Sequence, residues 1–489
     1  MQVKALDFLL WQKRFDLIFK YLYVKDSSSF AKTAYLESIR AFNNYSEESS
    51  NGIKKNSPDD FISTFDGLIN TIKKEGYQTE QGTIPVGRSG EIIDGAHRLA
   101  ICAYLNYTIK TEPSCLDALW DYQFFRDNGM DENIMDYGAL EYVKLNPHAY
   151  IVNLQPVTTV DNENNVLEIL NKHGFVYYFK KCWLSYNGLV NLKKICYGSF
   201  WEKAPWIGTP EDGFSGARDH ANHSMGRNSM RVFVFVCDKF SKVQNAKNEI
   251  RDIYGIGNYS VHINDTHEEA ICLAENYFNA NTLFQLNTRP YHLYDELFEK
   301  NIEVLKKECY SRNIDINRVC GAGSTPMNVF QIRHSQDVDY LSLDEDVLPD
   351  NEIISSHNKH QDIYPHSIRN IITNPSYHMY YNGIKFISLD ILYAMKMQNS
   401  RAAKNILDCK KIHRILMYRK IVRQISQKKI CQRGNTKKQG KWVLYLYKYN
   451  VKYGDISIKI LMLNKWNSLK KKYPIMAKCI SRIKKNGIS

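Results

Sequence analysis

The stretch GAGSTPMNVFQIRHSQDVDY, residues 321–340, carries the strongest structural signal in the chain. In an extended strand, residues two positions apart point to the same face, so Asp337 and Asp339 project together while Val338 points into a core. Two carboxylates on one face repel each other, and burying them without a partner is costly. A divalent cation with oxygen ligands relieves that cost, so the pair predicts a site for Mg²⁺ or Mn²⁺.

A glycine and a serine, Gly323 and Ser324, stand twelve residues before the acidic pair. Glycine lets the backbone approach a phosphate closely, and the following N–H groups with the serine hydroxyl bind phosphate oxygens. Metals held by such carboxylates clamp the oxygens of a phosphoryl displacement. We therefore expect phosphate binding at Gly323 and Ser324, metal binding at Asp337 and Asp339, and catalysis by Ser324 with both acids. The alternative is a surface turn with two solvated aspartates.

This Gly-Ser and Asp-x-Asp spacing resembles the nucleotidyltransferase fold of the polymerase-β type. The resemblance implies transfer of a nucleotidyl or phospho group from a nucleoside triphosphate, with Mg²⁺, by a domain at 301–412. The family usually has a third carboxylate on a later strand, and the candidates here are Asp362 and Asp390. Related bacterial transferases often show Lys-Asp-x-x-Asp on a later helix. In this chain the corresponding residues begin at Lys404, and Asn405 replaces the first Asp. Lys385 or Lys396 could contact phosphates, although a solvated helix face is the expected role of Lys396.

A second motif, IPVGRSGEIIDGAHRLAICAYL at 84–105, predicts two short strands followed by a helix. His97 and Arg98 fall in the first turn of that helix, where free N–H groups and the helix dipole favour anions. Arginine adds a fork matched to phosphate oxygens. The motif resembles the ParB/sulfiredoxin superfamily, whose members bind nucleotide phosphates at this turn, and some of which phosphorylate small molecules. The resemblance implies nucleotide or phosphate contacts from Asp94, Gly95, His97 and Arg98.

The ParB/sulfiredoxin-like domain is predicted to span 1–130. Apolar residues at helical spacing predict an amphipathic helix at its N-terminus, over the first 26 residues. Two alternatives remain for the motif. Asp94 capping a helix, with Arg98 in a surface ion pair, is a purely structural explanation, and ParB proteins also bind DNA.

Residues 150–300 predict an α/β middle domain containing a parallel βαβ unit, with the apolar run 231–237 as a buried strand. Ligands in such sheets lie beyond the C-terminal ends of the strands. Two polar clusters are expected to meet there: His262 with Asp265, and Arg218 with His220 in a Gly- and His-rich loop at 213–223. Capping of a helix by Asp265 or Thr266, with Glu268 or Glu269 in its first turn, is the alternative for the first cluster.

Positive charge is concentrated at the C-terminus. Of 65 Lys and Arg residues, 23 lie from Lys410 onward, where Asp455 is the one acid; the rest of the chain is net acidic. A basic helical extension at 413–489 with interleaved apolar residues suits peripheral contact with an anionic membrane, where each cation contributes about 1 kcal/mol. Packing on the enzyme with a solvated basic face is the alternative, and nucleic acid is a less favoured partner.

Composition predicts a globular cytoplasmic protein. The chain has 489 residues, 44% of them hydrophobic, with no uninterrupted apolar run of spanning length. Its eleven cysteines are scattered without a CxxC pair, which favours a reducing compartment, the cytoplasm, with peripheral contact at the inner membrane face.

We therefore expect an α/β and α+β multidomain enzyme. The layout resembles multidomain enzymes of bacterial surface-polysaccharide (O-antigen or capsule) biosynthesis. The resemblance implies a Mg²⁺-dependent nucleotidyltransferase or phosphotransferase that uses a nucleoside triphosphate and a small sugar or alcohol phosphate. A second nucleotide or phosphate site, with kinase activity, is implied in the ParB-like domain. The alternatives are a ParB-like nucleic-acid-binding regulator and a toxin-type nucleotidyltransferase that modifies a macromolecule.

Overall fold

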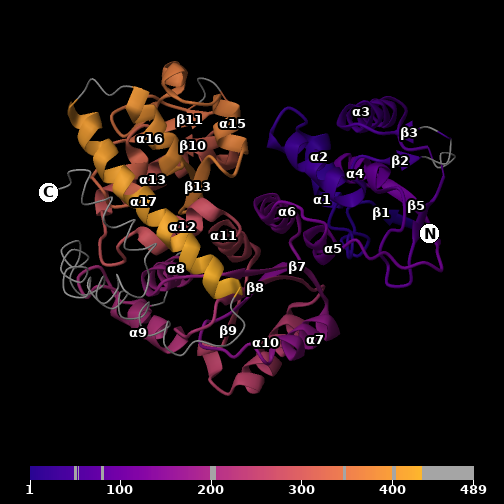
Figure 1. Ribbon diagram of the computed structural model, residues 1–489, viewed down its shortest axis with the longest axis horizontal. Coiled ribbons are helices and arrows are strands. Elements are labelled where there is room, and N and C mark those ends of the chain that lie inside the picture. The colour runs from indigo at the N-terminus through magenta and orange to yellow at the C-terminus, as the bar shows by residue number, and fades with distance from the viewer. Residues whose placement is uncertain are drawn as a thin grey trace, which may run out of the picture. The chain divides into compact units, whose positions relative to one another are not determined.

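The computed structural model describes residues 1–48, 52, 54–78, 82–198, 205–344, 348–398 and 403–431, with side chains up to residue 419 in the last helix. The protein is mixed α/β, about 52% helical, with several small sheets (Figure 1), which confirms the predicted mixed class. Residues Met1–Cys431 form one compact unit. Most of the predicted basic extension lies outside the described residues.

The N-terminal sheet has the order β1-β5-β4, with β1 antiparallel and β4 parallel to β5. Its strands are β1 (Gln2–Lys4), β4 (Ile84–Val86) and β5 (Thr108–Pro113), and a separate hairpin joins β2 (Glu47–Glu48) and β3 (Lys54–Lys55). The accompanying helices are α1 (Leu17–Lys25), α2 (Phe30–Asn43), α3 (Pro58–Glu75), α4 (Ala96–Tyr104), α5 (Tyr122–Asp127) and α6 (Glu132–Leu145).

The prediction of an amphipathic helix from the first residue is wrong. Residues 2–4 pair with β5 as a strand, and the first helix begins only at Leu17. Seven of the nine residues of α1 are buried, including Lys20, whose ammonium pairs with buried Asp16. Lys20 and Asp16 therefore form a buried ion pair, and α1 lacks a solvated face.

The middle sheet has the order β7-β8-β6-β9 and is antiparallel throughout. Its strands are β6 (Ala149–Leu154), β7 (Phe175–Cys182), β8 (Met230–Val236) and β9 (Val261–Ile263), and its helices are α7 (Glu163–His173), α8 (Tyr186–Gly198), α9 (Ser215–Ser224), α10 (Phe240–Tyr254), α11 (His267–Tyr277) and α12 (Ala280–Thr288). The predicted βαβ unit is present in split form as β8, α10 and β9: both strands run antiparallel to β6, and so parallel to each other, but β6 lies between them. Alternation along β8 places Phe233 against α7 and α10, and Val234 against α8 and α11, so helices cover both faces.

The third sheet has the order β12-β11-β10-β14-β13, with β10 parallel to β14 and antiparallel to β11. Its strands are β10 (Val319–Gly321), β11 (Val338–Ser342), β12 (Ile354–Ser356), β13 (His378–Tyr381) and β14 (Ile384–Ile387). Its helices are α13 (Glu296–Ser311), α14 (Thr325–Val329), α15 (Ile368–Thr373), α16 (Leu389–Gln398) and α17 (Ala403–Cys431). The predicted order of strand, short helix and strand over 321–340 is present as β10, α14 and β11.

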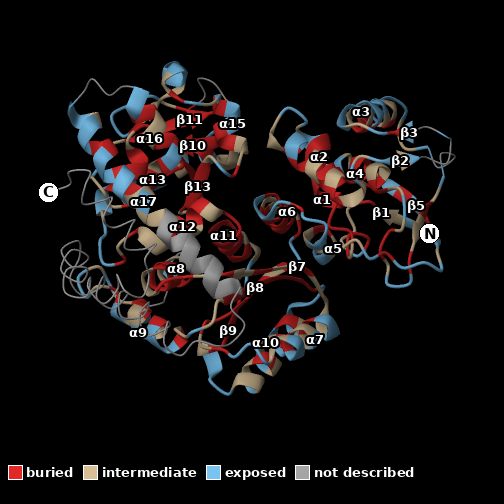
Figure 2. Cartoon of the chain, in the orientation of Figure 1, coloured by how far each residue is buried: buried red, intermediate tan, exposed pale blue. Residues whose placement is uncertain are grey.

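Four short 3₁₀ helices complete the described structure: η2 (Pro205–Ile207), η3 (Gly257–Tyr259), η4 (Ile316–Arg318) and η5 (Asn358–Ile363). Figure 2 shows buried residues concentrated in the strands and on the helix faces that contact them. In the part of the chain that the structure describes, every helix is too short or too polar to cross a membrane.

Candidate active site

The turn after β10 closes directly onto the acidic strand. Gly323 has φ +53°, and a Cβ atom built on it would lie 1.8 Å from Oδ2 of Asp339. The Ser324 N–H donates to the same oxygen at 3.3 Å, and the Ala322 N–H donates to the Asp339 carbonyl at 2.7 Å. Only glycine fits at position 323, because any side chain there would displace the carboxylate.

The Asp339 carboxylate is held by neutral donors. Ser355 donates its hydroxyl to Oδ1 at 3.0 Å, and Nε2 of His357 lies 3.8 Å from that oxygen. The Asp339 N–H donates to the Thr325 hydroxyl at 3.0 Å, which ties β11 to the start of α14. Among the described residues no Lys or Arg pairs with Asp339, so its negative charge is not neutralised by a protein cation.

Asp337 lies one residue before β11, with Val338 fully buried between the two half-buried aspartates as the sequence predicts. Both carboxylates influence the pKa of the same imidazole, that of His357. Burial lowers the pKa of His357 below its ordinary value, while Asp339 and then Asp337 oppose that shift. The two acids and His357 therefore share one local electrostatic environment.

The residue beside Asp339 on the neighbouring strand is a serine and not a third acid. Ser355 on β12 is the register partner of Asp339 on β11. Neither predicted candidate joins the site: Asp362 is exposed in η5, and Asp390 at the start of α16 pairs with Arg419. Within the described ranges no group of three or more His, Cys, Asp or Glu side chains is arranged to hold a metal ion. A cation held by Asp337 and Asp339 would need oxygens from its substrate and from water to complete its shell.

A tyrosine connects the glycine turn to His357. The Gly323 N–H donates to the Tyr364 hydroxyl at 3.1 Å, and that hydroxyl lies 2.7 Å from Nδ1 of His357. We assign the hydroxyl proton to Nδ1, so that the oxygen accepts from Gly323 and the O–H donates to the imidazole. The neutral imidazole then carries its hydrogen on Nε2, the nitrogen that faces Asp339.

Lys396 on α16 reaches the Gly-Ser turn from 72 positions away in the chain, donating to the Ser324 hydroxyl at 3.0 Å. It also pairs with Asp408 on α17 at 3.0 Å, and both side chains are under 5% exposed. The expectation of a solvated role for Lys396 is wrong, because α17 packs over this face of α16. Asn405, the departure from the related motif, places its side-chain oxygen 3.5 Å from the same ammonium.

Only some of the residues predicted for the N-terminal phosphate site lie together at the turn before α4. Gly95 caps α4 with φ +80°, and the Arg98 guanidinium folds back over it, 3.1 Å from where a Cβ of Gly95 would lie. Asp94 is exposed and does not cap the helix, so the capping explanation is wrong. His97 turns the other way, with Nε2 3.0 Å from the Tyr35 hydroxyl and its ring 4.6 Å from that of Phe65. Burial lowers the pKa of His97 well below its ordinary value.

The two predicted clusters of the middle domain meet through Tyr197. Its hydroxyl lies 3.2 Å from Nδ1 of His262, and its ring centroid lies 5.9 Å from that of His220. Arg218 and Asp265 are not part of this contact: Arg218 donates to the Asp212 carbonyl, and Asp265 pairs with Lys247.

The stretch predicted as a Gly- and His-rich loop is largely helix α9, from Ser215 to Ser224. The Asp212 carboxylate accepts the N–H groups of Thr209 and Ser215 at 3.0 and 2.9 Å, which organises the turn before the helix. Glycine at position 216 permits a close backbone approach, as its added Cβ would lie 1.4 Å from the Trp206 carbonyl. The Asp212 carboxylate thus fixes the turn before α9, and Gly216 leaves room for the Trp206 carbonyl. Together these contacts account for a helix in a stretch that contains glycines.

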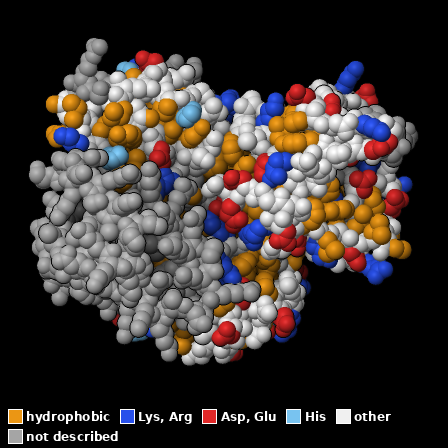
Figure 3. Space-filling model, viewed as in Figure 1, with side chains coloured by type: hydrophobic (Ala, Val, Ile, Leu, Met, Phe, Trp, Pro, Cys, Tyr) orange, Lys and Arg blue, Asp and Glu red, His pale blue; other side chains and the backbone are white. Residues whose placement is uncertain are grey.

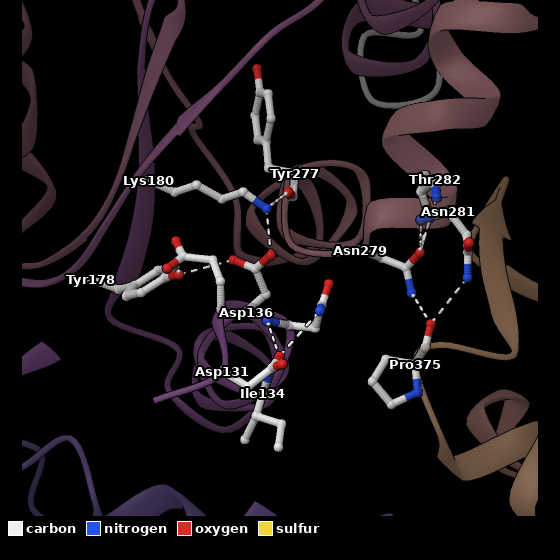
Figure 4. Close-up of polar contacts among 12 residues, drawn as sticks. Asp131, Ile134, Asp136, Tyr178, Lys180, Tyr277, Asn279, Asn281, Thr282 and Pro375 are labelled. Atoms are coloured by element: carbon white, nitrogen blue, oxygen red, sulfur yellow. Dashed lines mark hydrogen bonds and ion pairs between the residues drawn. The ribbon is translucent and has the colours of Figure 1, made fainter. Parts of the chain in front are cut away.

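A cavity of about 450 Å³ lies where α6, the α11–α12 junction, α16 and α17 meet. At its edge the buried Asp136 carboxylate accepts the Tyr178 hydroxyl at 2.9 Å and pairs with Lys180, as Figure 4 shows. Asn279 and Asn281 both donate to the Pro375 carbonyl, at 3.1 and 3.3 Å. These polar side chains already have hydrogen-bond or ion-pair partners within the protein, which favours a structural role for this junction.

Comparison of the sequence with protein-family models and with curated proteins, and of the fold with solved structures, gave no match. The functional assignment therefore depends on the geometry of the chain itself.

Proposed function

We propose that the protein is a Mg²⁺-dependent nucleotidyltransferase or phosphotransferase with its active site at the Gly323–Ser324 turn and Asp339. The observation that carries the proposal is the contact between this turn and the acidic strand: Oδ2 of Asp339 occupies the space that a Cβ of Gly323 would fill. A backbone turn and a carboxylate so close together suit a phosphate and a divalent cation bound side by side.

Asp337 and Asp339 would hold the cation, which when bound supplies positive charge to the phosphate oxygens. Ser324 and Lys396 are disposed to bind the donor phosphates, since the Lys396 ammonium lies 3.0 Å from the Ser324 hydroxyl. The Nε2–H of His357 faces the same carboxylate oxygen that Ser355 binds, and it can donate to a phosphate oxygen there. Catalysis of this kind depends mainly on positioning and charge stabilisation of an in-line displacement.

The substrate class and setting extend this proposal. A small sugar or alcohol phosphate as acceptor, and a place in bacterial surface-polysaccharide biosynthesis, rest on the resemblance of the domain layout. A second phosphate site, with kinase activity, would use Gly95 and Arg98, where the guanidinium lies over the turn. His97 is a packing residue in this arrangement, because its ring is enclosed by Tyr35 and Phe65. Cytoplasmic location with peripheral membrane contact rests on the basic segment after Lys410.

The alternative of a nucleic-acid-binding regulator is less well supported. On the face shown in Figure 3, acidic and basic side chains of the described residues are interspersed rather than gathered by sign. Duplex binding needs a basic surface that tracks phosphates. Binding of the full chain to duplex DNA with a steep salt dependence would favour the regulator.

The test is an assay with each nucleoside triphosphate, Mg²⁺ and a panel of sugar and alcohol phosphates, followed by product analysis. We expect transfer by the wild-type chain and a loss of at least 100-fold in the Asp339→Asn variant, by analogy with the loss of one preorganised charge-stabilising group. The matched control is Asp350→Asn, which removes a carboxylate that pairs with Lys359 in the same domain. Wild-type rates in Asp339→Asn would refute the proposal, and label transferred to protein or tRNA would favour the toxin-type enzyme.

A further inference from the structure

A buried lysine in the middle domain has no acidic partner. Lys193, on α8, is 3% exposed, and its ammonium makes no ion pair or hydrogen bond with any described residue. Lysine is rarely buried without a counter-charge, because removing an ammonium from water is costly. Burial lowers the pKa of Lys193 to about 8, so near neutral pH the group retains a positive charge that no acid among the described residues pairs with.

The ammonium of Lys193 lies beside the Tyr197 cluster described above. Its Nζ is 5.7 Å from the centroid of the Tyr197 ring. That ring also contacts His262 and Trp206, with centroids 5.2 and 5.1 Å away. Burial is the main cause of the lowered pKa of His220, to about 3, and the charge of Lys193 adds to it. The lysine and the two histidines therefore surround one tyrosine ring.

Among the described residues, the acid that contacts this cluster is Glu269, and both of its carboxylate oxygens already have hydrogen-bond partners. Oε1 of Glu269 lies 2.7 Å from Nε2 of His262, and its Oε2 accepts the Asp265 N–H at 2.9 Å. His220 uses Nδ1 with the Ser224 hydroxyl at 3.1 Å. Among the described residues, the ammonium of Lys193 and Nε2 of His220 are left as polar groups without a hydrogen-bond partner.

Aromatic rings extend from this buried charge to the surface. Trp206 is 41% exposed, and its ring centroid is 5.7 Å from that of His220. His220 lies 5.1 Å from Tyr259, which stacks on His223 at 4.7 Å. Gly216 fixes the position of Trp206, since only a residue without a Cβ tolerates the Trp206 carbonyl at this distance. Exposed rings held next to an unbalanced buried cation are typical of a site that receives a ring-bearing anion.

We infer that Lys193, His220 and Trp206 form a further ligand site, distinct from the two phosphate sites proposed above, for a small organic phosphate that carries a sugar or base ring. The phosphate pairs with the ammonium of Lys193 and accepts a hydrogen bond from His220, and the ring packs on the exposed face of Trp206. This site lies on the middle domain and is independent of the proposed transferase site.

The test is isothermal titration calorimetry of the full chain in EDTA, with AMP, ribose 5-phosphate, inorganic phosphate and adenosine as probes. We expect AMP or ribose 5-phosphate to bind to the wild-type protein, and the Lys193→Met variant to lose at least tenfold in affinity at one site. Adenosine lacks the anion and is expected not to bind there. Trp206→Ala is expected to weaken the ring-bearing probes more than inorganic phosphate. Lys242→Met, which removes a surface lysine paired with Asp238, is the matched control.

The melting temperature supplies a second criterion. Lys193→Met removes an unbalanced buried charge and keeps the side-chain volume, so the free variant should melt above the wild type. A variant that melts lower, or fails to fold, would show that the ammonium serves the fold and would overturn the inference. His220→Gln, which leaves the lysine in place, is expected to weaken phosphate binding as well. Unchanged binding in both variants, or equal binding of AMP and adenosine, would also overturn it.

Discussion

Oδ2 of Asp339 lies 1.8 Å from the point where a Cβ of Gly323 would stand, and it accepts the N–H of Ser324 at 3.3 Å. The turn and the strand thus form one unit, although the two residues belong to different elements. Tyr364 and Lys396 hold this unit from two further directions, through the Gly323 N–H and the Ser324 hydroxyl. Substitutions at Gly323, Lys396 and Tyr364 are expected to separate the steric, charge and hydrogen-bond contributions to this unit.

Gly323→Ala should lower the free energy of unfolding by about 1–3 kcal/mol and abolish transfer, because the methyl group displaces Asp339 and φ is positive. Urea unfolding and the transfer assay measure the two effects. Gly383→Ala is the matched control: its φ is +74°, but no atom lies within 4 Å of the added Cβ. It should show the backbone strain alone and keep full activity. Equal effects of the two substitutions would contradict the steric argument.

Lys396→Met should destabilise the fold by about 3–5 kcal/mol, because, among the described residues, it leaves the buried Asp408 carboxylate with Arg333, at 3.4 Å, as its one cationic partner. Adding Asp408→Asn to Lys396→Met should recover much of that loss in urea unfolding, since the unpaired charge is removed. The double variant should still bind nucleoside triphosphate poorly, with a raised KM, as Ser324 lacks its lysine. A double variant with wild-type KM would show that Lys396 acts only on stability.

Tyr364→Phe should cost about 1–3 kcal/mol of stability, because the buried Gly323 N–H loses its acceptor. The same change removes the donor to Nδ1 of His357. In the wild type, ¹⁵N NMR of the imidazole should show the hydrogen of neutral His357 on Nε2, and in the variant the two tautomers should mix. A wild-type spectrum with the hydrogen on Nδ1 would contradict the assigned direction of these hydrogen bonds.

Acid should destabilise the fold partly through His378, which is 2% exposed and donates from Nδ1 to the Ile371 carbonyl at 3.0 Å. Burial, assisted by Lys385, lowers the pKa of His378 well below its ordinary value. Below about pH 6.5 the unfolded chain binds a proton that the folded chain does not, so stability falls as pH decreases. His378→Gln should reduce the slope of unfolding free energy against pH by about 1.4 kcal/mol per unit between pH 6 and 5. Urea unfolding at several pH values measures this slope, and an unchanged slope would contradict the assignment.

Local patterns predicted several elements correctly. The Asn382-Gly383 pair, with φ of +48° and +74°, forms the turn between β13 and β14, because these residues tolerate positive φ. The apolar run 231–237 is offset by one residue from the buried strand β8, Met230–Val236. Pairing was not predictable in the same way. The position of β6 between β8 and β9 depends on contacts between residues about a hundred positions apart, which no local pattern records.

The sequence by itself determined the order of strand, short helix and strand over 321–340, since the glycine, Ser324 at the start of α14 and the alternation around Val338 act over a few residues. Only the tertiary structure decided what surrounds that unit. Ser355 donates to Asp339, whereas the expected third acids, Asp362 and Asp390, lie elsewhere. Lys396 is buried against Ser324 rather than solvated. The physical reason is that backbone preferences act between neighbours in the chain, whereas burial and charge pairing depend on which distant segments pack together.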